Sequence, residues 1–550
     1  MHSGSEEPKT EREGSPDGGV RDIVIVGGGT SGWMSATYLR RAYAGARITV
    51  IEAPSIPRIG VGEATIPNLN SAFWQFLGIP ESEWMPAVRA TCKMGIKFAN
   101  WSTSQAADPN DHYWHLFGVM PAYAGLPLPH YWNQQRINNG ETERFDEACY
   151  REMQMASHHR SPVDLDGQKW SNYAWHFDSN LLAEFLKKRA LEWGVRLVPE
   201  RVVDATTNRD GSIAAVITDR GDRIGGDFFI DCTGFRSLLL GEALGEPFLD
   251  ASDQLLCNAA VATQLLHTDD EAPLDAFTTA TALDNGWSWH IPLLGRVGTG
   301  YVYSNRHCTE DEAIAEFSAH LGIDPDEHTW NRIQFPVGRR ARAWVSNCLA
   351  VGLAGNFLEP LESTALYLTY GALHQLVQHM PDGNLAHADR DGFNESLAYS
   401  YDDCKDFVQM HYVCSPRSDT QFWQDNQQLN VSATLQDKLD RYRDGQVINP
   451  TTTSADAYYN NFDYEFRNFW TEGSYYAVLA GMGVFPEQVH ESLRDGAGAN
   501  SVDHLFSSVK ERGAYAAQVL PSHRDFLVSL YHDEHDRVID LRDRSTAPHL

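Results

Sequence analysis

The sequence predicts an α/β fold organised around a parallel sheet, and three observations lead to this expectation. A short, uniformly apolar strand at residues 23–26 runs into a glycine-rich turn at 27–32. A second apolar strand follows at 48–51, and similar strands return much later, at 227–230 and within 349–356. Strands that are apolar throughout are typical of parallel sheets covered on both faces.

The glycine-rich turn carries the pattern of a dinucleotide-binding site. Its glycines match G-x-G-x-x-G, which allows a tight turn and lets the backbone approach a pyrophosphate. The helix expected at 33–42 directs its amino-terminal dipole at that phosphate. An acidic residue ends the second strand about 20 residues later, where a carboxylate binds a ribose hydroxyl. The residues expected to contact the cofactor here are Gly27, Gly29, Thr30, Ser31, Gly32 and Glu52.

Two later segments favour FAD over a nicotinamide dinucleotide. The strand at 227–230 ends in D-x-x-G-x-R, a pattern common in FAD-dependent oxidoreductases, where the glycine lets the backbone approach the cofactor. Residues 349–356 have the same form, a strand followed by small residues and a helix start. Enzymes that use a nicotinamide dinucleotide rarely contact it through three such loops at strand ends. We therefore add Asp231, Gly234 and Leu353 to the expected FAD contacts.

Composition narrows the classes of partner. The 550 residues carry a net charge of −30, which disfavours nucleic acid and anionic membranes. Eight widely spaced cysteines without a C-x-x-C pair argue against structural disulfides and zinc sites. No apolar run reaches membrane-spanning length, and the N-terminus has no signal-peptide core. We expect a cytoplasmic protein without a metal, in which the histidines near 532–535 belong to a solvated tail.

The segment from Trp287 to Pro292 reads W-S-W-H-I-P. On an extended segment, Trp287 and Trp289 project to the same side because side chains alternate along a strand. We expect Pro292 to end the ladder pairing. Taken alone, the pattern favours a strand that covers a core.

Two further segments each leave two interpretations open. In 357–365, Ser363 or Thr364 is expected to cap an apolar helix at 365–380. Glu359 and Glu362 then complement the helix dipole at the surface, which the spacing favours, or the amides at 364 and 365 hold a small anion.

The other segment, 92–98, alternates as a single strand with Lys93 and Lys97 on one side. An ordinary half-solvated strand is the simpler interpretation. In the alternative, one lysine enters a buried channel, where loss of water lowers its pKa and frees an amine for chemistry.

Several blocks together resemble the flavin-dependent tryptophan halogenases. They are G-G-G-T-S-G-W at 27–33, G-V-G-E-A-T at 60–65, the tryptophan pair and E-P-L-E-S-T at 359–364, supported by matching blocks at 172–178 and 465–470. The likeness runs from about residue 21 to beyond 530 and is nearest to the tryptophan 7-halogenases of rebeccamycin and pyrrolnitrin biosynthesis, which are antibiotic pathways. It implies an FAD-binding, Rossmann-like module of the flavin monooxygenase type with an interleaved, mostly helical substrate-binding module.

The domain organisation expected on this basis has three parts. Residues 1–20 are rich in Gly, Ser, Pro and charge and are predicted to be a disordered lead-in. Residues 21–390 form the FAD-binding module, with inserted substrate-pocket segments at about 66–175. Residues 391–550 form a mostly helical substrate-binding module.

The resemblance also implies a relayed reaction. A separate NADH-dependent reductase supplies FADH2, which reacts with O2 to a flavin hydroperoxide. Chloride or bromide attacks this peroxide, and the hypohalous acid passes through a tunnel to tryptophan. Lys93 then forms a haloamine or hydrogen-bonds the hypohalous acid, and Glu362 orients the electrophile or accepts the ring proton. Trp287 and Trp289, with Ser363 beside them, separate the flavin from the substrate.

The remaining site residues are expected from the same resemblance. His115, Phe117 and Trp470 enclose the indole, an arrangement that aromatic stacking explains. The other substrate contacts are Tyr458, Tyr459, Glu465, Phe469 and Ser474; further cofactor contacts are Gly62, Glu63 and Ala64; and the halide contacts are Thr364 and Ala365.

Two positions depart from the pattern of the family. Ala365 stands where close relatives have glycine, which adds a methyl group at the halide site and excludes a left-handed backbone. Ser474 stands where they have asparagine. Tryptophan 5- or 6-halogenation, another indole substrate, a flavin monooxygenase and a non-catalytic flavin-binding protein therefore remain as alternatives, and a homodimer is possible.

Overall fold

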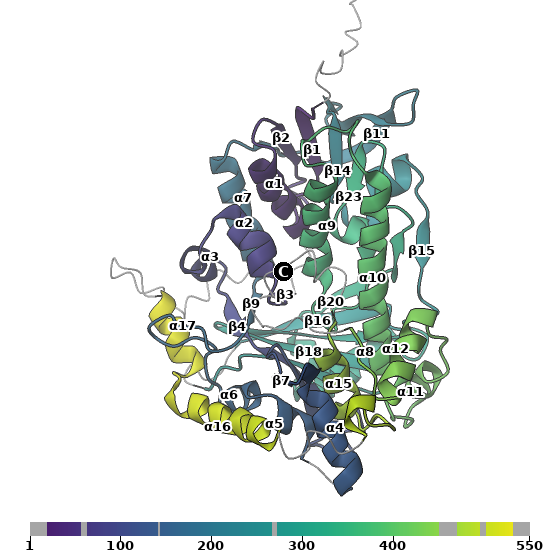
Figure 1. The fold of residues 1–550 in the computed structure, drawn as a ribbon. Coiled ribbons are helices and arrows are strands. Elements are labelled where there is room, and N and C mark those ends of the chain that lie inside the picture. The colour runs from purple at the N-terminus through teal and green to yellow at the C-terminus, as the bar shows by residue number, and fades with distance from the viewer. Residues whose placement is uncertain are drawn as a thin grey trace, which may run out of the picture.

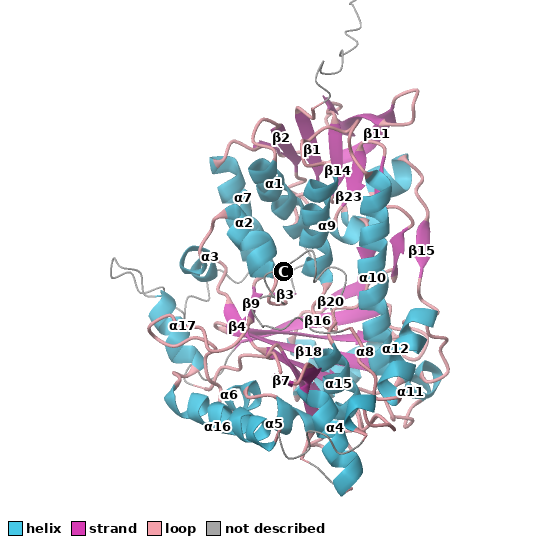
Figure 2. Ribbon diagram, viewed as in Figure 1, coloured by secondary structure: helices cyan, strands magenta, loops and turns pink. Residues whose placement is uncertain are grey.

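A computed structural model describes residues 19–56, 63–140, 143–266, 272–449, 470–494 and 502–531. A parallel sheet with its helices occupies the upper part of Figure 1, and a larger, mainly antiparallel sheet with further helices occupies the lower part. The long helices α9 (Ala365–His379) and α10 (Arg390–Val413) pack against each other beside both sheets. Figure 2 shows helices covering the outside of both parts.

The six-stranded upper sheet confirms the predicted α/β fold. Its central strand β1 pairs in parallel with β2 and β14, and β14 pairs in parallel with β23. Side chains of β1 alternate between two cores, because Ile23 and Ile25 belong to one buried cluster and Val24 and Val26 to another. The strand order is β10-β2-β1-β14-β23-β22, with bounds Arg196–Val198, Arg47–Ile51, Asp22–Val26, Phe228–Asp231, Cys348–Ala350 and Trp344–Val345.

One face of this sheet is covered by helices and the other by a small antiparallel sheet. Helix α1 (Thr30–Ala42) packs against α7 (Ser179–Glu192) and α9. Helix α1 starts at Thr30, three residues before the predicted start at Trp33, because Gly29 already occupies its N-cap. The small sheet consists of β11 (Val202–Thr207), β12 (Ile213–Thr218) and β13 (Arg223–Gly225).

The seven-stranded lower sheet brings together segments far apart in the sequence. Strand β5 pairs in parallel with β17, and β6 adds to its free edge. The strand order is β20-β16-β19-β18-β17-β5-β6, with bounds Asn331–Gln334, Ala259–Leu266, Arg296–Tyr303, Gly286–Leu293, Thr278–Ala282, Gly95–Ala99 and His112–Leu116.

Strand β18 carries the W-S-W-H-I-P segment, and the expected end of pairing at Pro292 is wrong. Pro292 pairs with Val297, and the β18–β19 ladder continues to Leu293. Strand β17 on the other side of β18 reaches only as far as His290. Proline is tolerated here because only one neighbouring strand requires hydrogen bonds.

The expected single strand at 92–98 is also wrong. Strand β4 (Thr91–Lys93) pairs with β9 (Ala174–Phe177) in a small sheet that also holds β3 (Glu63–Ala64). The chain then changes sheet at Met94 and continues as β5. Lys93 is therefore fully buried, whereas Lys97 is half-buried, so a half-solvated strand does not describe Lys93.

The lead-in predicted at 1–20 extends too far by two residues at its end. Val20 donates its amide to Gly383 O, and Gly19 pairs with Asn384, so the turn after α9 orders them. Residues 1–18 lie outside the described ranges, as does the predicted tail at 532–535.

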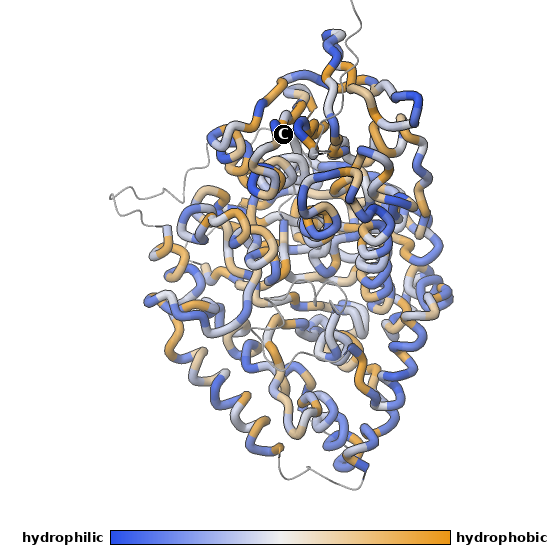
Figure 3. Tube along the Cα trace, turned by 45° about the horizontal axis from the view of Figure 1, so that its top comes forward, coloured by the Kyte–Doolittle hydropathy of each residue, from blue (hydrophilic) through white to orange (hydrophobic). Residues whose placement is uncertain are grey.

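The other helices enclose the lower part and flank the upper one. Figure 3 shows hydrophilic and hydrophobic residues alternating along the peripheral helices, as expected where each buries one face. None of the helices within the described ranges is long and apolar enough to cross a bilayer. The helices are α2 Gln75–Leu77, α3 Glu81–Ala87, α4 Leu128–Asn139, α5 Phe145–Cys149, α6 Glu152–Ser157, α8 Glu310–Leu321, α11 Gln421–Asn426, α12 Ala433–Arg443, α15 Glu472–Gly481, α16 Asp503–Val519 and α17 His523–Tyr531. The remaining strands are β7 Ala122–Tyr123, β8 Leu126–Pro127, β15 Phe248–Asp250, β21 Gly338–Arg340 and β24 Asn356–Phe357.

The glycine turn generates a stability prediction. A Cβ at Gly32 would lie 1.9 Å from Gly27 O, whereas a Cβ at Gly29 would meet no atom within 4 Å, and Gly29 has a φ of −75°. We expect Gly32→Ala to lower the free energy of unfolding by at least about 2 kcal/mol through overpacking. The matched variant Gly29→Ala should unfold within about 1 kcal/mol of the parent. Denaturant titration measures both, and equal midpoints for the two variants would contradict the close packing of the turn.

Candidate active site

A cavity of about 650 Å³ runs from the glycine turn towards the lower sheet. At one end it is lined by the turn itself and by loops that follow β14 and β23. At the other end lie two indoles of β18 and the start of α9. The lining residues at that second end include Trp287, Trp289, Ile291, Leu361, Ser363 and Ala365.

The upper end has the features of a nucleotide site. Gly27 has a φ of +113°, and a Cβ there would lie 2.1 Å from Cys232 O, so this turn requires glycine. No side chain caps the start of α1, which leaves its first amides directed at the cavity. Glu52 also lines the cavity, and its carboxylate binds Lys187 Nζ at 2.6 Å.

Three loops converge on this end, and their contacts fit an extended dinucleotide such as FAD. Gly352 has a φ of +68°, and a Cβ there would lie 2.2 Å from Ser31 Oγ, so the loop after β23 packs directly on the glycine turn. The loop after β14 completes the wall. Ten of the expected cofactor contacts line the cavity: Gly27, Gly29, Thr30, Ser31, Gly32, Glu52, Glu63, Ala64, Gly234 and Leu353.

Two expected cofactor contacts, Asp231 and Gly62, are not among these lining residues. The buried carboxylate of Asp231 accepts hydrogen bonds from the amides of Thr233, Leu239 and Leu240 and does not line the cavity. It shapes the loop that carries Gly234. Gly62 lies outside the described residues.

The two indoles form a wall at the lower end of the cavity. Trp287 and Trp289 are both buried, and their ring centroids lie 6.2 Å apart with the planes inclined by 58°. Trp287 Nε1 donates to Glu359 Oε2 at 2.6 Å. Trp289 packs closely on Gly300, where a Cβ would lie 2.2 Å from the indole ring. Trp287 and Trp289 both project from β18 into the same cavity wall, as their spacing predicted.

Lys93 is completely buried and does not line the cavity. Its Nζ donates to Ser363 Oγ at 2.7 Å and to Thr65 O at 3.0 Å, and it lies 5.3 Å from the centre of the Phe117 ring. Burial lowers the pKa of Lys93 to about 7, although the nearby Glu362 carboxylate raises it. The alternative of a lysine in a buried site is therefore the one the structure supports. Ser363 lines the cavity and so connects it to this amine.

Glu362 is the second buried charged group, and the surface role favoured by the spacing is wrong. Glu359 and Glu362 are both fully buried because the loop before α9 turns inward. His115 Nδ1 lies 3.0 Å and 3.1 Å from the two Glu362 oxygens, and His411 Nε2 lies 3.0 Å from Oε1. Burial alone raises the pKa of Glu362, but the two histidines outweigh it and lower the pKa to about 2.

Both ring nitrogens of His411 face oxygen atoms. Its Nδ1 lies 2.8 Å from Phe407 O, and a carbonyl oxygen can only accept. Its Nε2 faces the Glu362 carboxylate, which at a pKa of about 2 also only accepts. His411 thus joins helix α10 to the loop that carries Glu362.

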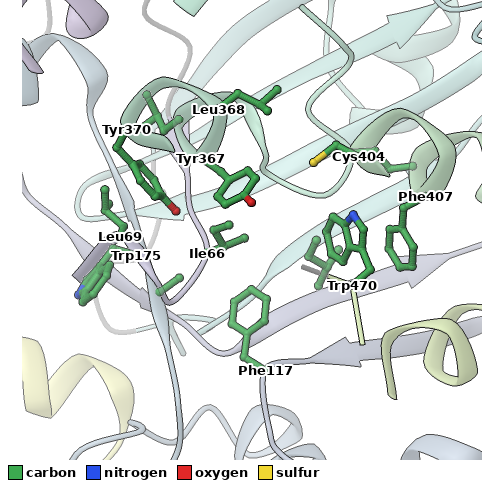
Figure 4. Close-up of a cluster of buried hydrophobic side chains, with 14 of the residues drawn as sticks. Ile66, Leu69, Phe117, Trp175, Tyr367, Leu368, Tyr370, Cys404, Phe407 and Trp470 are labelled. Carbon is green, nitrogen blue, oxygen red and sulfur yellow. The ribbon is translucent and has the colours of Figure 1, made fainter. Parts of the chain in front are cut away.

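An aromatic enclosure adjoins Glu362. His115 and Trp470 have ring centroids 6.0 Å apart, and Trp470 stacks on Phe407 at 4.0 Å with planes inclined by 9°. Figure 4 shows Trp470 beside Phe407, with Phe117, which directly follows β6, below them. Ser474 lies half-buried on α15. The predicted contacts Tyr458, Tyr459, Glu465 and Phe469 lie outside the described residues.

The start of α9 fits the anion-site interpretation. Thr364 occupies the N-cap without a side-chain capping bond, and its buried Oγ1 has no hydrogen-bond partner among the described residues. The expected side-chain cap is therefore wrong. Ala365 is the first helical residue and lines the cavity. Its backbone is not left-handed, so this position does not require glycine. The left-handed residue in this loop is Ser363, with a φ of +61°.

A sequence model described as tryptophan halogenase matches residues 22–497. The chain belongs to this family. It is 48% identical over 522 residues to the tryptophan 7-halogenase RebH of Lentzea aerocolonigenes, covering 93% of this chain and 98% of the relative. It is 43% identical to the tryptophan 6-halogenase ThaL of Streptomyces albogriseolus, covering 94% and 99%. The solved tryptophan 6-halogenase of Streptomyces toxytricini is 34% identical and superimposes with a TM-score of 0.84, covering 92% of this chain and 99% of that one.

As a tryptophan halogenase, the chain is a flavin-dependent oxidoreductase, and the predicted family and FAD-binding, Rossmann-like fold are confirmed. The family uses FAD and a halide and acts on tryptophan. Among the described residues, no group of histidines, cysteines and acids is placed to hold a metal ion.

The sequence did not indicate three residues of this halogenase site. His411 and Phe407 lie one turn apart on α10, and Tyr412 follows directly, where its hydroxyl donates to Glu359. The spacing of these three residues is common on any partly buried helix face, so it does not indicate a functional site. Only the partners supplied by distant loops distinguish them from ordinary core residues.

The buried amine generates a titration prediction. In protein with ¹³C- or ¹⁵N-labelled lysine, we expect one side-chain signal to titrate near pH 7 by NMR and to vanish in Lys93→Met. Lys97→Met, the matched control on the next strand, should retain this signal. Between pH 7 and the ordinary value of 10.5, the unfolded chain keeps a proton that the folded chain has released, so this lysine makes the free energy of unfolding rise with pH. A spectrum in which every lysine titrates above pH 9 contradicts the assignment.

Proposed function

We propose that the chain catalyses FADH2- and O2-dependent chlorination or bromination of tryptophan at indole C7. The observation that supports this proposal is the pair of buried groups, Lys93 and Glu362, which lie outside the nucleotide cavity and are connected to it through Ser363. The separation suits an oxidant that is made in one place and used in another. Position C7 is supported by the 48% identity to a 7-halogenase, and C6 is the alternative because a 6-halogenase is 43% identical.

Reduced FAD in the cavity supplies, with O2 and halide, the hypohalous acid that the reaction consumes. The amides at the start of α9 and Ala365 hold the halide at the cavity edge. Ser363 borders the cavity and binds Lys93 Nζ, which gives the oxidant a route to the amine. The wall indoles keep the substrate away from the cofactor.

Lys93 and Glu362 divide the chemistry between them. Lys93 either displaces water from hypohalous acid to form a haloamine or, as an ammonium, hydrogen-bonds the hypohalous oxygen and gives it the proton with which it leaves as water when the halogen is transferred. As the carbon–halogen bond forms, the ring carbon loses its hydrogen as a proton. Glu362, held ionised by His115 and His411, accepts that proton. Its low pKa lets Glu362 release the proton again after the halogenated product has formed.

The substrate lies between His115, Phe117 and Trp470, with Ser474 nearby. Tyr458, Tyr459, Glu465 and Phe469 remain predicted contacts to the amino-acid part and the ring. A separate NADH-dependent flavin reductase in the cytoplasm delivers FADH2, and the enzyme belongs to an antibiotic pathway. An aromatic enclosure next to a buried amine suits a flat, electron-rich ring.

The function is tested by turnover. Protein, flavin reductase, NADH, FAD, chloride or bromide, and tryptophan should give a monohalogenated product with the isotope pattern of the halogen, and NMR should place the halogen at C7. A halogen at C6 or C5 overturns the regiochemistry alone. Oxygenated product without halogen, or flavin reoxidation without any modified indole, overturns the function.

Lys93 provides the sharpest test of the mechanism. Lys93→Met should reduce halogenation by at least about 100-fold, since removing a group that acts on the reacting atoms costs several kcal/mol, while FADH2 reoxidation continues. Lys97→Met, which changes a half-buried lysine of the next strand, should retain both activities. Product formation by Lys93→Met at the parent rate contradicts the assignment.

Ala365 generates a prediction about the halide. The variant Ala365→Gly retains the amide and removes the methyl group from the cavity edge, which makes room for the larger ion. We expect the ratio of bromination to chlorination under equal halide concentrations to rise several-fold, measured by mass spectrometry of the products. An unchanged ratio shows that this methyl group does not contact the halide.

A further inference from the structure

The loop before α9 holds a second buried carboxylate that the mechanism does not use. Glu359 is completely buried and does not line the cavity. Its Oε2 accepts hydrogen bonds from Trp287 Nε1 at 2.6 Å and from Tyr412 Oη at 2.5 Å. Burial raises the pKa of Glu359 to about 7, although both hydrogen bonds lower it. Burying a carboxyl group is costly, so its place in the site calls for a specific partner.

Two neighbouring residues of α10 fasten this loop at two points. His411 binds Glu362, and Tyr412 binds Glu359. Each carboxylate then reaches a different strand of the lower sheet, since Glu362 binds His115 of β6 and Glu359 binds Trp287 of β18. The reaction centre and the wall are thus held by the same short segment.

The two wall indoles are held differently. Trp289 Nε1 is buried without a hydrogen-bond partner among the described residues, and close packing on Gly300 confines its ring. Trp287 Nε1 has Glu359 as its acceptor. Removing this acceptor leaves a buried N–H unsatisfied, which favours movement of the indole toward the adjoining cavity.

We propose that Glu359 is a positioning residue that holds Trp287 in the wall of the flavin cavity, so that Ser363 remains the route from the cavity to Lys93. The proposal rests on the proposed function. With the indole fixed, hypohalous acid leaves the cavity by way of Ser363 and meets Lys93. With the indole loose, a larger share of the oxidant escapes into solution. Glu359 does not line the cavity, and of its two hydrogen-bond partners, Trp287 and Tyr412, only Trp287 does, so Glu359 acts on the cavity through Trp287.

The measured quantity is the coupling ratio, the halogenated tryptophan formed per FADH2 oxidised, together with the hypohalous acid captured by an added 1,3-diketone trap. The full-length enzyme is assayed with reductase, NADH, FAD and bromide. We expect Glu359→Leu to lower the coupling ratio at least fivefold and to raise trapped hypohalous acid correspondingly, with FADH2 reoxidation within twofold of the parent. A loss of folding alone does not redirect oxidant into the trap.

Three further variants locate the effect. Glu359→Gln keeps an acceptor oxygen for Trp287 and should retain most of the coupling. Tyr412→Phe removes the other donor to the same oxygen and should change the ratio less than twofold. Trp287→Phe should lower the ratio as Glu359→Leu does, and the double variant Glu359→Leu/Trp287→Phe should be no worse than Trp287→Phe, because both changes remove one interaction.

The outcomes separate the two proposals. If the parent enzyme gives no halogenated product, the proposed function fails and Glu359 is not at issue. If the parent halogenates and a folded Glu359→Leu variant keeps the parental ratio, the positioning role is overturned. Should Glu359→Leu not fold, Glu359→Asp takes its place, since its shorter side chain draws the carboxylate away from Trp287. Parental coupling in Glu359→Asp, with losses that add fully in Glu359→Asp/Trp287→Phe, likewise overturns the proposal.

Discussion

An amine buried away from water is the constraint on which the rest of this active site depends. Lys93 reaches its position only because the chain changes from one sheet to another at Met94. The amine then needs acceptors from elsewhere, and Thr65 O and Ser363 Oγ supply them. A carboxylate nearby offsets part of the loss of water. Each of these partners arrives on a different segment, so the position of one side chain determines how several loops must meet.

The loop between β24 and α9 brings these demands together. It contributes Glu359, Glu362 and Ser363 within five residues, and each side chain faces a different neighbour. Helix α10 supplies the counterparts with His411 and Tyr412. The positive φ of Ser363 lets the chain turn from the loop into α9 while its hydroxyl still reaches the amine. The groups to which we assign halide binding and proton transfer thus adjoin one another along a single stretch of backbone.

The sequence predicted the upper part of the molecule well because local patterns encode it. Apolar strands and glycines at 27–32 specify parallel pairing and a phosphate turn within a few residues. The lower part was harder, because pairing there joins distant segments. Nothing in 92–98 reveals that Met94 divides two strands, and nothing around Glu359 and Glu362 reveals that the loop turns inward. Lys93 and Glu362 were identified through family resemblance, whereas His411, Phe407 and Tyr412 carry no local signal at all.

The parallel pairing of β5 with β17 has a consequence for how this enzyme acquires activity. Ile96 lies opposite Thr278, so the strand that follows Lys93 pairs early with β6 but joins the rest of the lower sheet only after β17 has been synthesised. Contacts between such distant residues form slowly, because a long loop must close before they stabilise anything. The nucleotide half contains earlier and more local pairings, such as that of β1 with β2. The upper sheet nevertheless also needs the distant strands β14 and β23, and the lower sheet needs β20, so neither sheet is complete until late in synthesis. The cavity and the buried amine therefore reach their final form together.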